Sequence, residues 1–223
     1  MALGAMVKRV HCVGIGGIGV RAIAEALLVK GYYVTGSDQK LGPGISHLVS
    51  LGVQCYEGHS AEHVKSADLV IYSSAISSHN PEIINAKKLG IPCVTRGQVL
   101  ADLFNSSKGI AVVGSHGKTT TTSIISHVLI QAGLDPTCMI GGVVDGYVSP
   151  FVSGQGEYMV AEGDESDGSF LSLQPCVAIV SNIDRDHLNN YDGSYEKLMD
   201  AFVQFLNLLP SDGIAILNID DPG

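Results

Sequence analysis

The sequence has no tryptophan, few basic residues and no long apolar run. Its 223 residues include 13 lysines and arginines against 22 aspartates and glutamates, a net charge of −9. No apolar segment approaches the roughly 20 residues that a membrane-spanning helix needs. An acidic chain also lacks the basic face that nucleic-acid binding requires. We therefore predict a protein that neither inserts into a membrane nor binds nucleic acid.

Paired cysteine motifs are also missing. None of the five cysteines forms a C-x-x-C pair, and most lie in apolar runs. This pattern favours a reduced protein in the cytoplasm over a disulfide-stabilised or zinc-ribbon protein. Hydrophobic residues make up 45% of the chain and the mean hydropathy is +0.26, so the chain is globular rather than disordered.

Strand-like and helix-like segments alternate along the whole chain, which predicts an α/β fold with parallel sheets. The predicted strands are residues 9–13, 33–37, 69–72, 91–95, 110–113, 158–162, 177–181 and 214–218. The predicted helices are residues 18–30, 81–89, 97–105, 122–132 and 195–208.

Residues 114–122 read GSHGKTTTT and resemble the end of a phosphate-binding loop. The usual pattern, G-x-x-x-x-G-K-S/T, needs a glycine at position 112, which is valine here. A strand precedes the loop and a helix follows it, so free backbone N–H groups and the positive end of a helix dipole point at an anion. We predict that Lys118 and the threonine hydroxyls contact phosphate and magnesium. The alternative is a glycine turn with a capped helix.

Residues 14–19, GIGGIG, fit the G-x-G-x-x-G pattern between a predicted strand and helix, and Asp38 ends the next strand. Such a loop indicates a diphosphate at a helix N-terminus, whether of NAD, of FAD or of a UDP-sugar. The alternative is tight helix–strand packing alone. Two nucleotide loops in one chain favour ATP acting on a nucleotide substrate. The polar break at residues 105–108 separates them, so we predict domains at residues 1–107 and 108–223.

Two further predicted strands end in polar clusters, where α/β sheets collect their ligands. The first cluster predicts a magnesium ligand, although a solvated acidic turn is the alternative; it contains Glu162, Asp164, Glu165 and Asp167. The second contains Asn182, Asp184, Asp186 and His187. His116 either contacts phosphate or fills its turn. The remaining histidines show no ligand spacing, and we interpret them as structural or surface residues: His11, His47, His59, His63, His79 and His127.

As a set, these motifs resemble the Mur ligases over nearly the whole chain. In that family the phosphate loop has the short form G-x-x-G-K-S/T, which residues 114–119 satisfy. The segments that carry the resemblance are HCVGIGGIGV (11–20), TGSD (35–38), SSAIS (73–77), NPEI (80–83), GSHGKTTTT (114–122), GLDPT (133–137), EGDESDGSFL (162–171) and SNIDRDHLNNY (181–191).

The resemblance implies a Rossmann-like N-terminal domain for UDP-N-acetylmuramate and a P-loop-type central domain for ATP. It implies ligation of L-alanine through an acyl phosphate, in peptidoglycan synthesis and hence in cell-wall biogenesis, cell shape and cell division. The implied substrate-binding residues are Gly16, Gly17, Gly19, Ser37, Asp38, Ser74 and Arg96. The implied ATP-binding residues are Gly114, Ser115, His116, Gly117, Lys118, Thr119 and Thr120. The implied catalytic residues are Lys118, Glu162 and His187, and the implied magnesium ligands are Thr119, Glu162 and His187.

The chain is shorter than the three-domain family. We expect residues 108–223 to be an incomplete central domain, the amino-acid-binding domain to be absent, and this fragment to be inactive alone. The nearest alternative is the recycling ligase that adds a tripeptide to the same substrate, although Ser166 favours the alanine branch. An NAD-dependent oxidoreductase would explain only residues 14–19, and a non-catalytic nucleotide-binding module is the third alternative.

Overall fold

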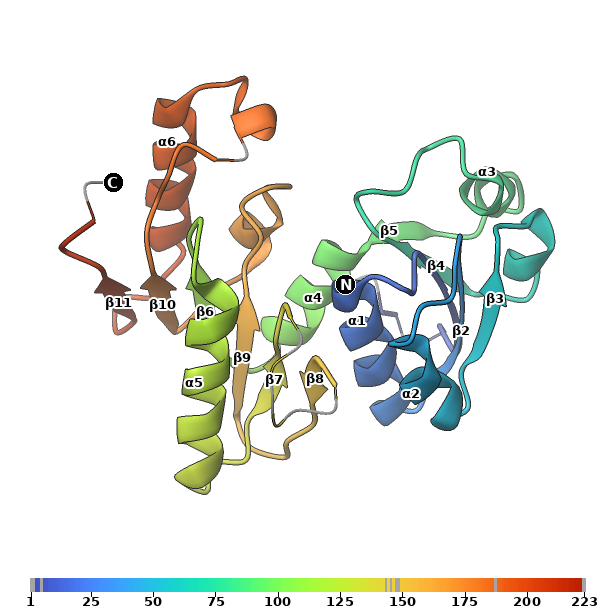
Figure 1. Ribbon diagram of the computed structural model, residues 1–223, viewed down its shortest axis with the longest axis horizontal. Helices are drawn as coiled ribbons and strands as arrows, with labels where there is room; N and C mark the ends of the chain where they lie inside the picture. Colours follow the sequence, from blue (N-terminus) through green and yellow to red (C-terminus); the bar gives the residue numbers. More distant parts are fainter. Residues whose placement is uncertain are drawn as a thin grey trace. The chain divides into compact units, whose positions relative to one another are not determined.

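The computed structural model describes residues 3–4, 6–142, 144, 146, 149–186 and 188–221 (Figure 1). The chain divides into two compact units. The first comprises residues 1–100 with 147–151, and the second comprises residues 101–146 with 152–223. The division falls inside helix α4 (Arg96–Phe104), slightly before the domain boundary that we predict after residue 107.

The first unit contains a sheet of five parallel strands in the order β3-β2-β1-β4-β5. This is the doubly wound order of a Rossmann-like fold, and its switch point lies between β1 and β4. The strands are β1 (Arg9–Val13), β2 (Tyr33–Asp38), β3 (Gln54–Glu57), β4 (Leu69–Tyr72) and β5 (Cys93–Thr95). The helices are α1 (Ile18–Val29), α2 (Ile45–Ser50), the 3-10 helix η1 (Ala61–Val64) and α3 (Pro81–Lys88).

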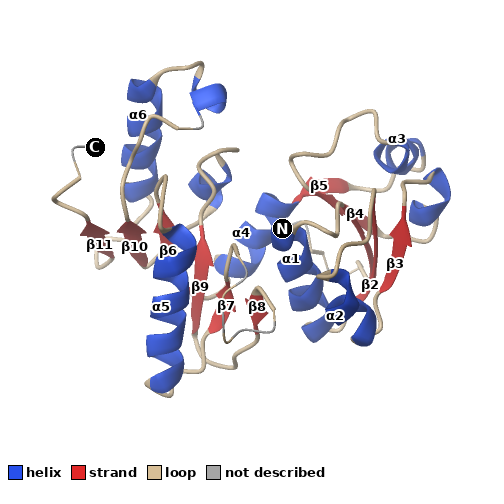
Figure 2. Ribbon diagram, in the orientation of Figure 1, coloured by secondary structure: helices blue, strands red, loops and turns tan. Residues whose placement is uncertain are grey.

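The second unit contains a sheet in the order β11-β10-β6-β9-β7-β8 (Figure 2). Its strands are β6 (Lys108–Val113), β7 (Thr137–Met139), β8 (Phe151–Val152), β9 (Tyr158–Glu162), β10 (Val177–Val180) and β11 (Ile214–Leu217). Its helices are α5 (Lys118–Gln131), α6 (Tyr195–Leu206), and the 3-10 helices η2 (Ser169–Ser172) and η3 (Leu188–Tyr191). Strand β6 is central and pairs in parallel with β9 and β10.

The central strands are apolar because both of their faces are covered. Four of the five β1 residues are buried, as are five of the six in β6. The predicted α/β class with parallel sheets is therefore confirmed. None of the helices in the described ranges has the length and apolar character needed to cross a membrane.

One predicted boundary is wrong by a full helical turn. Helix α5 begins at Lys118 rather than at Thr122, so residues 119–122 are helical. Their β-branching disfavours a helix only weakly, whereas Gly117, in the left-handed conformation, starts the helix directly after the loop. Thr122 is buried and Ile124 is exposed, the reverse of what their polarity suggests.

Candidate nucleotide-binding loops

The first glycine loop, residues 14–19, joins β1 to α1 in the first unit. Gly14 has a φ of +83°, which favours glycine, and Gly17 is the N-cap residue of α1. The N–H of Gly16 donates to Asp38 Oδ2 at 2.8 Å. A Cβ on Gly16 would lie 2.7 Å from that same oxygen, so glycine permits this approach. The sequence placed Asp38 beside this loop, and the structure brings the two together.

The other predicted substrate residues of the first unit differ in their exposure and in their contact with the loop. The side chain of Arg96 packs against Gly19 at the end of the loop, because a Cβ on Gly19 would lie 3.1 Å from Arg96 Cδ. Ser74 is exposed in the turn after β4, next to the switch point. Ser37 differs, because its side chain is buried and its hydroxyl donates to Glu82 Oε2 at 2.6 Å. The hydroxyl of Ser37 therefore contacts a carboxylate that the sequence analysis had not linked to this site.

The second glycine loop, residues 114–117, joins β6 to α5 in the second unit. Gly114 has a φ of +131°, and a Cβ there would lie 2.3 Å from Ser181 Oγ. The end of β10 holds the loop: Asn182 Oδ1 accepts from the N–H of His116, and its Nδ2 donates to the His116 carbonyl, both at 2.8 Å. Ser115 accepts a hydrogen bond from the Asp184 N–H, also at 2.8 Å. The loop is thus held from the neighbouring strand.

Lys118 is the first residue of α5, and its ammonium group turns back toward the loop. Its Nζ donates to the carbonyl of Gly114 at 2.5 Å and to that of Ser115 at 3.2 Å. It also lies 2.9 Å from Glu165 Oε1. Glu165 is buried, so this ion pair fixes the cation at the mouth of the loop. The sequence had placed Glu165 only in an acidic cluster.

Glu162 ends β9 and lies beside the start of the same helix. Thr119 Oγ1 donates to Glu162 Oε2 at 3.1 Å, and the Gly141 N–H donates to Oε1 at 2.6 Å. Burial raises the pKa of Glu162, and these two hydrogen bonds lower it less than burial raises it. The structure therefore brings together two oxygen groups predicted as metal ligands. The contact with Gly141 was not predicted, although the glycine pair 141–142 after β7 was a signal for close backbone approach.

An exposed cluster of one histidine and two aspartates also lies at the loop. His116 Nε2 lies 3.3 Å from Asp186 Oδ2 and 3.6 Å from Asp184 Oδ2, and all three side chains are exposed. Thr120 is exposed on the first turn of α5. His187, the predicted second metal ligand, lies outside the described residues. The structure thus groups the predicted ATP-site residues other than His187 around one loop.

Comparison with known proteins identifies both halves of the chain. Residues 9–108 match the catalytic domain of the Mur ligase family, and residues 112–223 match the Mur ligase middle domain. The chain belongs to the Mur ligase family. A UDP-N-acetylmuramate–L-alanine ligase from Sulfurihydrogenibium sp. (strain YO3AOP1) is 51% identical over 96% of this chain, and that from Aquifex aeolicus (strain VF5) is 49% identical over 97%. The chain spans 47% of each, about half the length of the curated relatives that it matches.

Solved structures of the family have the same fold. UDP-N-acetylmuramate-alanine ligase MurC from Thermotoga maritima matches 96% of this Mur ligase chain with a TM-score of 0.90 and 33% identity, over 50% of its own length. UDP-N-acetylmuramate:L-alanyl-gamma-D-glutamyl-meso-diaminopimelate ligase (MPL) from Neisseria meningitides matches with a TM-score of 0.87 and 27% identity. The match covers 96% of this chain and 72% of the MPL chain.

Proposed function

We propose that this chain binds UDP-N-acetylmuramate and ATP for the ligation of L-alanine, in peptidoglycan precursor synthesis. The observation that carries the proposal is the presence of two separate helix-terminal glycine loops in a chain about half identical to L-alanine ligases. In this proposal, residues 1–107 form the UDP-substrate domain and residues 108–223 belong to the ATP domain. Among the solved structures, the alanine ligase matches at 33% identity and the ligase MPL at 27%, which favours alanine.

The proposed reaction is acyl activation followed by amide formation. A carboxylate oxygen of the muramate lactyl group attacks the γ-phosphorus of ATP, the bond to the bridging oxygen breaks, and ADP leaves. The amine of L-alanine then attacks the acyl carbon, the bond to the phosphate oxygen breaks, and phosphate leaves as the nitrogen releases a proton. The first step brings a carboxylate toward the negatively charged triphosphate, and each step releases an anionic leaving group. Catalysis therefore depends on fixed positive charge.

Lys118 and the second glycine loop supply that charge in our proposal. The loop directs backbone N–H groups to the start of α5, where the helix dipole also favours an anion. The Lys118 ammonium, now bound by loop carbonyls and Glu165, would exchange these partners for the β- and γ-phosphate oxygens. Ser115, His116 and Thr120 would line the phosphates.

Magnesium fits the residues beside this loop. Thr119 and Glu162 offer a hydroxyl and a carboxylate, the oxygen ligands that magnesium prefers. Burial raises the pKa of Glu162, so a cation beside it would offset an ionised carboxylate that the protein leaves partly uncompensated. Magnesium bound here would neutralise charge on the phosphates. We propose His187 as a further ligand from its place in the sequence alone.

The first loop would bind the diphosphate of the UDP-substrate through Gly16, Gly17 and Gly19. Ser37 and Asp38 would contact the uridine side, with Ser74 and Arg96 as further contacts. Because Asp38 already accepts from the Gly16 N–H, its carboxylate would turn toward the ribose hydroxyls as the diphosphate takes its place. We also propose that the reaction occurs in the cytoplasm, which the five free cysteines favour.

Titration calorimetry tests the binding of both nucleotides. We expect one UDP-N-acetylmuramate per chain without magnesium, and one non-hydrolysable ATP analogue per chain only with magnesium. NAD should displace neither ligand. Binding of NAD in competition with the UDP-substrate would instead support the oxidoreductase alternative. In a protein of the relatives' full length, phosphate release with L-alanine rather than with tripeptide would separate the two ligase alternatives.

A further inference from the structure

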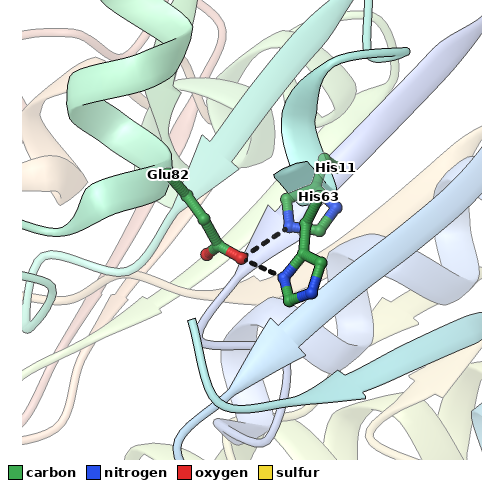
Figure 3. Close-up of side chains that lie close together, drawn as sticks. All are labelled: His11, His63 and Glu82. Carbon is green, nitrogen blue, oxygen red and sulfur yellow. Dashed lines mark hydrogen bonds and ion pairs between the residues drawn. The ribbon is translucent and has the colours of Figure 1, made fainter. Parts of the chain in front are cut away.

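Three side chains that lie far apart in the sequence meet inside the first unit. His11 comes from β1, His63 from η1 and Glu82 from the first turn of α3 (Figure 3). One ligand atom from each lies within 4.8 Å of the other two. His63 Nδ1 is 2.6 Å from Glu82 Oε1, and His11 Nε2 is 3.5 Å from the same oxygen. None of these three residues has a role in the function proposed above, although Glu82 accepts a hydrogen bond from Ser37, a proposed substrate contact.

His11 brings an unsatisfied nitrogen to this cluster. Its ring is fully buried, and its Nδ1 lies 2.8 Å from Thr35 Oγ1. Its Nε2 is buried without a hydrogen-bond partner, and the nearest carboxylate oxygen is too distant for a normal hydrogen bond. When Nδ1–H donates to Thr35, Nε2 directs a lone pair toward Glu82. Two electron-rich atoms facing each other in a buried space favour a cation between them.

Glu82 adds a buried carboxyl group. Its side chain is fully buried, and its oxygens lie 2.6–3.5 Å from the Ser37 hydroxyl and from nitrogens of three histidine rings. This carboxyl group is contacted by histidine rings, the Ser37 hydroxyl and the Ser60 N–H. A protonated imidazole or a metal ion would compensate a buried carboxylate here.

Neighbouring groups hold these side chains in place, as a metal site requires. The ring of Tyr56 stacks on that of His63, with centroids 4.1 Å apart and planes 10° apart. Glu82 Oε2 is held by Ser37 at 2.6 Å and by His59 Nδ1 at 3.0 Å, whereas Oε1 faces His11, His63 and the Ser60 N–H. The side chains of His59 and His63 are 12% and 16% exposed, so solvent reaches this side of the cluster.

We propose that His11, His63 and Glu82 bind one zinc ion in the first unit. Two imidazole nitrogens and one carboxylate oxygen form a donor set that zinc uses, with ligand distances of about 2.0–2.2 Å. Tetrahedral ligands lie farther apart than a hydrogen bond, so His63 Nδ1 moves away from Oε1 and loses its proton to admit the ion. Magnesium prefers oxygen ligands and does not suit this site. The ion would link β1, η1 and α3.

Zinc titration of the EDTA-treated, desalted 223-residue chain tests the proposal. We expect about one zinc ion per chain in competition with a chromophoric chelator, no competition from magnesium, and a higher unfolding temperature with zinc. Cobalt in place of zinc should give the visible absorption of a low-coordinate site. Absence of a chelator-competing zinc ion in the folded wild-type chain would overturn the proposal.

Variants assign the ion to this cluster. His63→Gln should weaken zinc binding at least 10-fold, and its partial exposure favours correct folding. Thr35→Val, which removes only the hydroxyl behind His11, should weaken binding about 10-fold. His79→Gln, at an exposed histidine, should leave zinc binding unchanged, and so should His116→Gln in the exposed cluster of the second unit. Zinc binding lost in His116→Gln but kept in His63→Gln would place the ion in the second unit and contradict the proposal.

Discussion

Each glycine loop leads into a helix, but the charged side chains beside the two loops have opposite signs. In the first loop an acid, Asp38, accepts from the Gly16 N–H, and the loop itself carries no charged side chain. At the second loop a cation, the Lys118 ammonium, donates to loop carbonyls and to Glu165. The N-cap glycines also differ, since Gly17 is extended (φ −72°) and Gly117 is left-handed (φ +80°). These differences support our proposal that the first loop holds a diphosphate and the second binds the phosphate that is transferred.

Removing the Lys118 cation beside the second loop should have the largest effect on the difference in ligand binding between the two loops. Lys118→Ala should weaken binding of an ATP analogue by about 10- to 100-fold, because a hydrogen bond to a charged group contributes roughly 1.5–3 kcal/mol. Binding of UDP-N-acetylmuramate should be unchanged. Calorimetry measures both, and Lys87→Ala on α3 is the matched control. A loss of both ligands would show that the loops are not separate sites.

A methyl group in the first loop should have the converse effect. A Cβ on Gly17 would meet only the Gly14 carbonyl at 3.4 Å, an ordinary contact, so Gly17→Ala should fold normally. It would occupy space that a diphosphate needs, and we expect about 10-fold weaker UDP-N-acetylmuramate binding with ATP binding retained. Gly42→Ala is the control, because its Cβ would meet nothing within 4 Å. Unchanged affinity in Gly17→Ala would contradict a diphosphate at this loop.

Glu162→Gln should test whether this carboxylate binds the magnesium ion on which ATP binding depends. We expect the variant to lose the magnesium dependence of ATP binding, measured by calorimetry over a magnesium series. Asp200→Asn, at an exposed carboxylate of α6, should behave as wild type. Magnesium dependence that persists in Glu162→Gln would assign the ion to other residues.

The same variant has a predictable pH dependence of stability. The pKa of Glu162 is raised in the folded state, so the folded protein binds its proton more tightly than the unfolded chain does. The free energy of unfolding in wild type should therefore fall as the pH rises from the unfolded pKa of about 4.3 through the raised folded value. Urea unfolding should show this decrease reduced in Glu162→Gln. An identical dependence of the free energy of unfolding on pH in both proteins would contradict a raised pKa at Glu162.

The smallest expected effect is at the N-cap of α6, which belongs to neither glycine loop. Ser194 is the N-cap of α6, and its Oγ accepts from the Lys197 N–H at 3.3 Å. Ser194→Ala should lower the free energy of unfolding by about 1 kcal/mol in urea, and Ser194→Gly by only a few tenths. Both ligands should bind normally. Weaker nucleotide binding in Ser194→Ala would show that the loops respond to distant changes in stability.

The sequence predicted what local patterns control and missed what depends on tertiary contacts. The long apolar strands and both glycine loops follow from periodicity and glycine spacing, so they were predictable. Strand β8 has only two residues, Phe151–Val152, and β7 has three, so neither carries a detectable pattern. Strand β3 and helix α2 were also missed, because they are short and mostly polar or mixed in character.

The second glycine loop and the proposed zinc site also differ in how far the sequence predicts them. Lys118, Thr119 and Glu162 belong to recognisable motifs at strand and helix ends, so their grouping was predictable. His11 and His63 were interpreted as structural or surface residues, because ligands from three distant elements have no sequence spacing. Parallel pairing and the packing of α3 on η1 bring them to Glu82. The roles of all these residues in binding and catalysis stay predictions.

Simultaneous titration most directly tests whether the two loops bind separate polyphosphates. Calorimetry would add UDP-N-acetylmuramate to the chain already saturated with an ATP analogue and magnesium. The account predicts that one UDP-N-acetylmuramate still binds per chain, without displacing the analogue. Displacement of one nucleotide by the other, or failure of either to bind the folded chain, would contradict it.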